Sequence, residues 1–195
     1  MTLPSGSVTF LFSDIEGSTR LAQRLGDDGW AELLREHDRI ADDAVADASG
    51  SIVKHEGDGV FAAFADPLAA ATAAVAFCRA LHGGPEPDGQ PRPRIRIGIH
   101  SGDGRLTGSG SDYVGIDVNY AARVSAAANG GQIAITEATR ERLAGALPDG
   151  THLVQMGPRR LKDFEEPRPI HLLVVPGVAD DPRPLRTNDA PTNFV

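Results

Sequence analysis

The sequence has a single cysteine and no excess of positive charge. Cys78 cannot form a disulfide within the chain, and its place in the helical pattern AVAFCRAL predicts a small core residue and not a reactive thiol. The formal net charge of -8 argues against a protein that binds nucleic acid by neutralising its phosphates. We therefore expect no nucleic-acid partner, although a local basic pocket for one small anion stays compatible with this charge.

The sequence also lacks a long apolar run. The longest uncharged stretch, from Leu68 to Cys78, is too short and too rich in alanine to span a bilayer. No charged-then-apolar signal segment precedes Val8, so we expect a cytoplasmic protein with no membrane partner. The 195 residues are 41% hydrophobic, which suits one compact domain with a real core.

Apolar periodicity divides the chain into alternating strands and helices. Continuous or alternating apolar runs predict strands, and apolar residues spaced by three and four predict helices. The expected strands are residues 7–12, 52–55, 60–64, 94–100, 132–136, 152–156 and 170–174, and the expected helices are residues 19–25, 30–48, 67–81, 114–128 and 137–143.

Turn residues complete this division. The motif EGDG, residues 56–59, predicts a hairpin because Asp-Gly supports positive φ. A tight hairpin among helices favours an α+β fold, in which helices pack on a mixed sheet. The composition of residues 82–93 predicts a loop, and the proline-rich stretch 176–195 predicts a flexible tail or linker, so the expected domain spans residues 8–175.

Two carboxylates lie where a metal site would place them. Asp14 ends the first strand, and Asp58 occupies the tip of the hairpin. Taken singly, the first is typical of a helix cap and the second of a turn. If the hairpin lies antiparallel beside the first strand, both carboxylates reach one edge of the sheet and can bracket Mg²⁺ around a triphosphate.

A turn of small residues follows Asp14. Gly17, Ser18 and Thr19 lie at the expected start of a helix, where backbone N–H groups have no partner within the helix. Such groups bind phosphate oxygens. We therefore expect the turn to hold the phosphates that a metal at Asp14 accompanies.

Four motifs together carry a family resemblance: FLFSDIEGSTRL, IVKHEGDGVFAAF, RIGIHSG and DYVGIDVNYAARV. Their order and spacing resemble the class III nucleotidyl cyclases, the catalytic domain of adenylate and guanylate cyclases. The resemblance implies a ferredoxin-like domain with a mainly antiparallel sheet. It also implies a head-to-tail homodimer with two active sites across its interface, each using two Mg²⁺ or Mn²⁺ ions.

The resemblance implies roles for particular residues. Asp14 and Asp58 match the two metal-binding aspartates, and the backbone carbonyl of Ile15 matches a further metal ligand. These would come from one chain of the dimer. The other chain would supply the residues that select the base, orient the ribose and stabilise the transition state, which match Lys54 and Asp112, Asn119, and Arg123 respectively.

Lys54 and Asp112 predict adenine as the base. Adenine presents an acceptor at N1 and a donor at N6, which complement a lysine donor and an aspartate acceptor, whereas guanine reverses the two. Family members that select guanine tend to carry Glu and Cys at these positions. ATP is therefore the predicted substrate.

Asn119 and Arg123 are four residues apart on an expected helix, so they share one face. Without the other motifs, such a pair is typical of a solvated helix surface. The fork of a guanidinium fits the equatorial oxygens of a phosphoryl group in transfer.

The sequence departs from the family pattern in two places. Several members carry a basic residue just after the IHSG turn, where this chain has Asp103, with Arg105 two residues later. Lys162 matches, only loosely, a lysine that reaches the terminal phosphate, and an ordinary surface lysine is the equal alternative.

These features predict an adenylate cyclase that forms 3′,5′-cyclic AMP and pyrophosphate. One alternative is a catalytically weak domain that binds nucleotide and dimerises within a larger regulator, which the proline-rich tail favours. A diguanylate cyclase is suggested by HEGDG, but the Gly-Gly-Asp/Glu-Glu-Phe motif of that family is absent.

Overall fold

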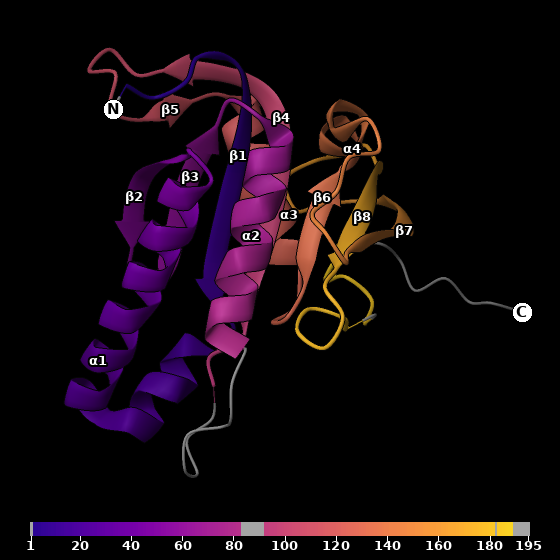
Figure 1. Cartoon of the computed structure of the whole chain (residues 1–195). Helices are drawn as coiled ribbons and strands as arrows, with labels where there is room; N and C mark the ends of the chain where they lie inside the picture. The colour runs from indigo at the N-terminus through magenta and orange to yellow at the C-terminus, as the bar shows by residue number, and fades with distance from the viewer. Residues whose placement is uncertain (1, 83–91, 182, 189–195) are drawn as a thin grey trace, which may run out of the picture.

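A computed structural model describes residues 2–82, 92–181 and 183–188 (Figure 1). The predicted loop at residues 82–93 falls mainly outside these ranges, as do residues 189–195 of the predicted tail. The strands are β1 (Gly6–Ile15), β2 (Ser51–Glu56), β3 (Gly59–Phe64), β4 (Ile95–Leu106), β5 (Tyr113–Val114), β6 (Ile133–Thr136), β7 (His152–Arg159) and β8 (Arg168–Val174). The helices are α1 (Ser18–Asp47), α2 (Pro67–His82), α3 (Ile116–Ala127) and α4 (Glu137–Leu143).

The strands form one mixed, mainly antiparallel sheet in the order β2-β3-β1-β4-β6-β8-β7, with β5 paired to β4. Within this order only β4 and β6 run parallel. The predicted α+β class is therefore confirmed. β1 is an inner strand of the sheet, between β3 and β4.

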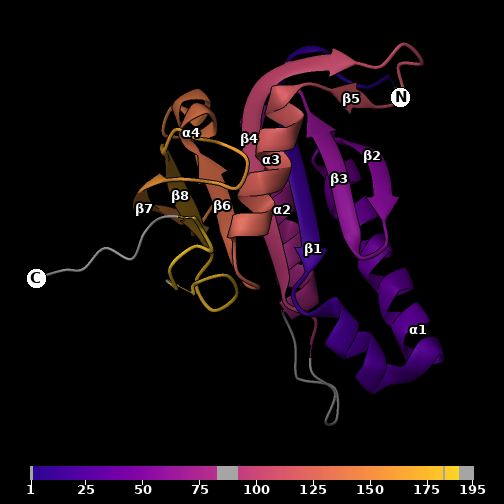
Figure 2. The ribbon, with the colours of Figure 1, turned by 180° about the vertical axis from the view of Figure 1, so that it is seen from behind.

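Helices cover both faces of this sheet. α1 and α2 pack together on one face, and α3 crosses the opposite face over β1 and β4 (Figures 1 and 2). β1 contributes side chains to both sides, because Leu11 belongs to the core beneath α1 and α2 while Phe10 belongs to the core near α3. Burial on two faces explains the continuous apolar run that predicted this strand.

The expected elements are confirmed with three differences. The helices predicted at residues 19–25 and 30–48 form one bent element, α1, whose break lies at Gly26 with φ 70° and ψ 175° (Figure 1). The prediction of a turn at IHSG is wrong, because His100–Gly102 continue strand β4 and pair with β1. The two-residue strand β5 was not predicted, because its pairing with β4 lies outside any local pattern.

The single cysteine is part of the core, as predicted. Cys78 is fully buried in α2, and burial raises the pKa of its thiol to about 12. A thiol with that pKa is protonated at neutral pH and therefore a poor nucleophile. Within the described parts of the chain, no helix is both long enough and apolar enough to cross a bilayer.

The segment after Val175 does not run free over its described length. Val175 pairs with Ala179 as an isolated bridge, and Ala179 and Leu185 are 3% and 6% exposed. Two side chains of this segment are thus buried against the domain, while most residues of 176–181 and 183–188 are exposed. Proline-rich composition predicts the lack of helix and strand here, but it does not exclude burial of single side chains.

The contact between β4 and α3 yields a stability prediction. A Cβ atom at Gly98 of β4 would lie 2.2 Å from the backbone nitrogen of Ser125 in α3. We expect Gly98→Ala to displace α3 and to lower the free energy of unfolding by about 1–3 kcal/mol, measured by urea denaturation. Gly108→Ala is the matched control, because a Cβ there meets nothing within 4 Å. Equal stability of the two variants would contradict this account of the contact.

Candidate active site

The two predicted metal carboxylates lie together where β1 ends and the β2–β3 hairpin turns. β1 and β3 are antiparallel with Ser13 opposite Val60, which brings the hairpin tip beside the end of β1. Oδ2 of Asp58 accepts a hydrogen bond from the backbone N–H of Ile15 at 3.1 Å. Asp14 and Asp58 therefore reach the same edge of the sheet, as the hairpin pattern led us to expect.

Sequence reasoning missed the partner of Asp14. Arg96 lies opposite Asp14 in the β1–β4 pairing, and its Nε donates to Oδ1 of Asp14 at 2.5 Å. The same guanidinium donates to the backbone carbonyl of Ala126, at the end of α3, at 3.1 Å. The alternation in RIRIGIH places Arg96 on one face of a strand, but only the register between β1 and β4 pairs it with Asp14.

The turn behind Asp14 has the geometry of an anion site. Gly17 precedes α1 with φ 69°, a left-handed conformation that glycine adopts without steric cost. No side chain caps this end of α1, while the carbonyl of Gly17 accepts from the N–H groups of Arg20 and Leu21. The N–H groups at the helix start, those of Ser18 and Thr19 included, are therefore placed to bind an anion.

The residues present fit a divalent cation. Two carboxylates and the carbonyl of Ile15 offer hard oxygen donors, which Mg²⁺ and Mn²⁺ prefer. In the described residues, no group of three or more His, Cys, Asp or Glu side chains is arranged to enclose a metal. Phosphate and water oxygens would complete the coordination, which is typical of Mg²⁺ sites that bind a metal together with a nucleotide.

A cavity of about 280 Å³ joins these carboxylates to Lys54. The residues of β1 and the hairpin form one side, and Ala122 and Ser125 of α3 form another. Its lining includes Phe12, Asp14, Lys54, Glu56, Asp58 and Phe61.

The two residues predicted to select the base contact each other. Nζ of Lys54 lies 2.9 Å from Oδ2 of Asp112, and the backbone N–H of Tyr113 donates to Oδ1 of Asp112 at 2.7 Å. The hydrogen bond that Lys54 donates to Asp112 raises the pKa of Lys54. Desolvation raises the pKa of Asp112, but the bonds from Lys54 and Tyr113 outweigh it, so the net pKa is lowered. Both side chains are therefore charged at neutral pH.

Asn119 and Arg123 lie on α3 beside a second cavity of about 300 Å³. Arg123 forms an ion pair with Asp163 at 2.6 Å, in the loop between β7 and β8. Lys162 is exposed in the same loop, next to Asp163. No local signal marks Asp163, because its partner lies 40 residues earlier in the chain.

The predicted metal carboxylates and the predicted catalytic residues of α3 line different cavities. The first contains the metal carboxylates and Lys54, and the second contains Asn119 and Arg123. Lys54 therefore lies beside the carboxylates of its own chain, although the family resemblance led us to expect it to serve the site that uses the carboxylates of the other chain. Ala122 of α3 lines both cavities, so the two cavities are neighbours that meet at this helix. Among the described residues, neither of these two cavities is lined by both the carboxylates and Arg123.

Asp103 lies in β4 and not after a turn, and its side chain is exposed. Its backbone N–H donates to Oδ2 of Asp117 at 2.7 Å, while Oδ1 of Asp117 lies 3.3 Å from Nε2 of His100. Burial lowers the pKa of His100, which favours the neutral imidazole at pH 7. These contacts attach the first turn of α3 to the sheet.

The sequence model of the adenylate and guanylate cyclase catalytic domain matches residues 2–171. The chain belongs to this family. Membership establishes a nucleotide cyclase domain and leaves open whether the substrate is ATP or GTP, because the family includes both kinds of cyclase.

Two relatives match at 31% and 32% identity. Rv0891c, an uncharacterized protein of Mycobacterium tuberculosis, is 31% identical over 195 residues, which cover 98% of this chain and 65% of that protein. The chain thus spans about two thirds of the length of that relative. A protein of Streptomyces griseus named adenylate cyclase is 32% identical over 117 residues, or 60% of this chain and 28% of that protein.

Solved structures of the family share the fold. The structure of adenylate cyclases from Trypanosoma brucei in their monomeric state matches with a TM-score of 0.83 at 25% identity. The match covers 96% of this chain and 99% of that one.

The carboxylate geometry yields a metal-binding prediction. Asp58→Asn keeps an oxygen that accepts from the N–H of Ile15 but removes the negative charge that a divalent ion requires. We expect the affinity for Mn²⁺, measured by electron paramagnetic resonance with a non-hydrolysable nucleotide present, to fall about tenfold or more. Circular dichroism should show an unchanged fold.

Asp43→Asn is the control for this experiment, because Asp43 is a 63% exposed carboxylate on α1, outside both cavities. It should bind Mn²⁺ as the unmodified protein does. Unchanged Mn²⁺ affinity in Asp58→Asn would remove Asp58 from the metal site.

Proposed function

We propose that the chain is the catalytic domain of an adenylate cyclase, which converts ATP into 3′,5′-cyclic AMP and pyrophosphate. The observation that carries this proposal is the approach of Asp14 and Asp58 at one edge of the sheet, beside an uncapped helix start. Carboxylates for cations next to free N–H groups for phosphates suit a nucleoside triphosphate.

The choice of adenine rests on Lys54 and Asp112. Their hydrogen bond places a charged donor and a charged acceptor side by side. Adenine offers the complementary pair at N1 and N6, and the base would replace the contact between the two side chains. Both side chains are more than one third exposed, at 38% and 35%, which leaves them accessible to a base.

In the proposed reaction, the ribose 3′-oxygen attacks the α-phosphorus and pyrophosphate leaves. When bound, Mg²⁺ or Mn²⁺ supplies positive charge that acidifies the 3′-hydroxyl and neutralises the phosphates. Asn119 orients the ribose, and Arg123 meets the charge that develops on the phosphoryl oxygens. The N–H groups of residues 17–19 and the ammonium of Lys162 bind the phosphates. The 3′-hydroxyl proton passes to water, to Asp14 or to the substrate itself.

The proposed active unit is a head-to-tail homodimer. The division of the site residues between two cavities supports this, since each cavity has part of the required chemistry. In a twofold dimer, the metal carboxylates of one chain face Asn119 and Arg123 of the other, and each interface residue appears twice. Two complete sites result.

A second candidate function is a weakly catalytic domain that binds nucleotide and dimerises within a longer regulator. The ion pairs of Asp14 with Arg96 and of Arg123 with Asp163 favour it, because both groups are engaged by the chain's own charges. Catalysis requires both pairs to open. A domain in which they stay closed would bind nucleotide without turnover.

A product assay separates the two candidates. We expect the purified protein with Mn²⁺ to form cyclic AMP from ATP faster than cyclic GMP from GTP, as measured by chromatography of the products. Tight nucleotide binding without product would support the regulatory candidate.

The same assay tests how the base is chosen. Lys54→Glu combined with Asp112→Cys should raise the ratio of GTP to ATP turnover, since a donor or acceptor that a mismatched base covers and leaves unpaired costs on the order of 1–3 kcal/mol. An unchanged ratio would show that these two residues do not select the base.

Mixed variants test the shared sites. Asp14→Ala and Arg123→Ala homodimers should each be nearly inactive, because every site lacks one essential group. After random exchange of equal amounts, about half of the dimers are mixed, and each mixed dimer has one intact site. We therefore expect roughly a quarter of the unmodified activity to return.

Subunit exchange is verified separately by fluorescence energy transfer between labelled chains. Exchange without recovered activity would mean that each chain contains a complete site, and the dimer proposal would fail.

A further inference from the structure

Residues 183–188 pack on the domain although they lie beyond residues 2–171, which the family model matches. We call these six residues the strap. In Figure 1 the C-terminal segment, in yellow, folds back beneath β6 and β8. The strap contacts three segments that the proposed site uses.

Two buried amides bind the backbone around the strap. Nε2 of Gln132 donates to the carbonyls of Asp181 and Arg183 at 2.9 and 2.8 Å, and Nδ2 of Asn129 donates to the carbonyl of Pro184 at 3.0 Å. Gln132 and Asn129 are only 2% and 7% exposed. Nδ2 of Asn129 also donates to Oε1 of Gln132 at 2.9 Å, so the two amides bind each other as well as the strap. An unpaired N–H at such depth is destabilising, and the carbonyls of Arg183 and Pro184 each accept from one of these amides.

The strap also reaches the helix that carries Asn119 and Arg123. Leu185 belongs to the buried cluster that contains Tyr120 and Val124 of α3. The backbone N–H of Arg186 donates to the carbonyl of Ala127, the last residue of α3, at 2.8 Å. The end of α3 is therefore attached to the strap by both apolar packing and a hydrogen bond.

Arg186 extends from the strap to the turn behind Asp14. Its guanidinium forms an ion pair with the carboxylate of Glu16, and its Nε donates to Oδ1 of Asn129 at 3.0 Å. Glu16 lies between Ile15 and Gly17, so it belongs to the turn with the proposed metal carbonyl and phosphate N–H groups. The backbone N–H of Glu16 donates to the carbonyl of Arg94 at 2.8 Å, so the turn is restrained by this backbone bond and by the ion pair of the Glu16 side chain.

The third contact is with the β7–β8 loop. The backbone N–H of Asn188 donates to the carbonyl of Arg160 at 3.0 Å. Arg160 precedes Lys162 and Asp163 by two and three residues. The strap therefore connects this loop, α3 and the turn at residues 15–19, which are otherwise separate in the chain.

We propose that the strap positions the active site, and that Arg186 acts through Glu16 as a positioning residue for the phosphate-binding turn. This inference rests on the proposed function, because it assigns the turn to nucleotide phosphates. Arg186 touches neither substrate nor metal. Its loss removes one of two restraints on the turn, the other being the backbone bond from Glu16 to Arg94. The N–H groups of Ser18 and Thr19 then bind phosphate less well, both in the substrate complex and in the transition state.

A change in binding that is equal in both states raises KM and leaves kcat unchanged. We expect Arg186→Ala and Glu16→Gln each to raise the KM for ATP about fivefold, with kcat within about twofold of the unmodified value. The double variant should be no worse than either single variant, because both remove the same ion pair. Arg186→Lys keeps a charge for Glu16 and should recover most of the affinity.

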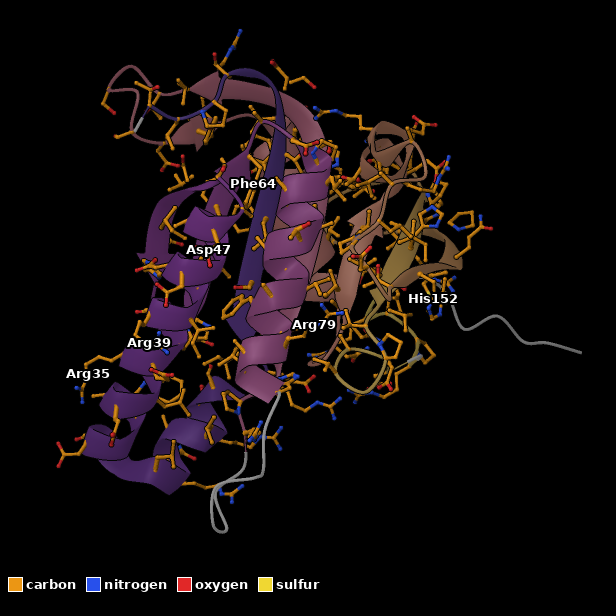
Figure 3. All side chains as sticks on the ribbon, in the orientation of Figure 1. Arg35, Arg39, Asp47, Phe64, Arg79 and His152 are labelled. Atoms are coloured by element: carbon orange, nitrogen blue, oxygen red, sulfur yellow. The ribbon has the colours of Figure 1, made fainter. Side chains whose placement is uncertain are left out.

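Arg39→Ala is the matched control. Arg39 forms ion pairs with Glu36 and Asp43 on the outer side of α1, and its side chain is 59% exposed (Figure 3). Its loss removes an exposed arginine and its ion pairs without touching the strap. We expect its KM and kcat to equal those of the unmodified protein.

Hydrogen–deuterium exchange of the nucleotide-free protein gives a measurement that does not depend on activity. The amides of Glu16 and Arg20, whose N–H groups are hydrogen bonded in the turn, should exchange faster in Arg186→Ala and Glu16→Gln than in the unmodified protein and in Arg39→Ala. If these amides exchange faster in the variants but the protein forms no cyclic nucleotide, the positioning role of the strap is supported and the proposed cyclase activity is rejected. Unchanged exchange at these amides, additive effects in the double variant, or lower thermal stability without a change in KM would each overturn the positioning role.

Discussion

The antiparallel register of β1 between β3 and β4 is the constraint on which the site depends. On one side it sets Asp14 opposite Arg96, and on the other it brings the hairpin close enough for Asp58 to accept from the N–H of Ile15. A shift of one residue would reverse the face of every side chain on β1. The side chains of β1 alternate between two separate cores, so such a shift would place each of them in the wrong core and would separate Asp14 from Arg96.

Three ion pairs join parts of the proposed site that are distant in the chain: Asp14 with Arg96, Lys54 with Asp112, and Arg123 with Asp163. All are partly exposed, and such pairs contribute only about 0–1 kcal/mol each. Little free energy is therefore lost when a metal ion, a base or a phosphoryl group replaces one partner. In the absence of nucleotide, these ion pairs hold the charged side chains near the places that the proposed reaction requires. Each pair can separate at a small cost in free energy.

α3 is the element that connects these features. Its middle separates the two cavities, its first turn is attached to β4 through Asp117, and its end is attached to Arg96 and to the strap. A helix restrained at both ends places Asn119 and Arg123 with little freedom, which catalysis by positioning requires. The contact of Gly98 with Ser125 shows how closely this helix approaches the sheet.

The sequence by itself determined the order and nearly all of the strands and helices, the α+β class, the buried cysteine and the placement of both carboxylates at one sheet edge. Periodicity, turn residues and the four motifs are local signals, and each reports on its own segment. Only the tertiary structure decided the partners Arg96 and Asp163, the strand β5, and the burial of Leu185 in a segment whose composition predicts a tail. Each of these depends on contacts between residues 40 or more positions apart or on pairing between strands, and no periodicity within one segment encodes which distant segment will pack against it.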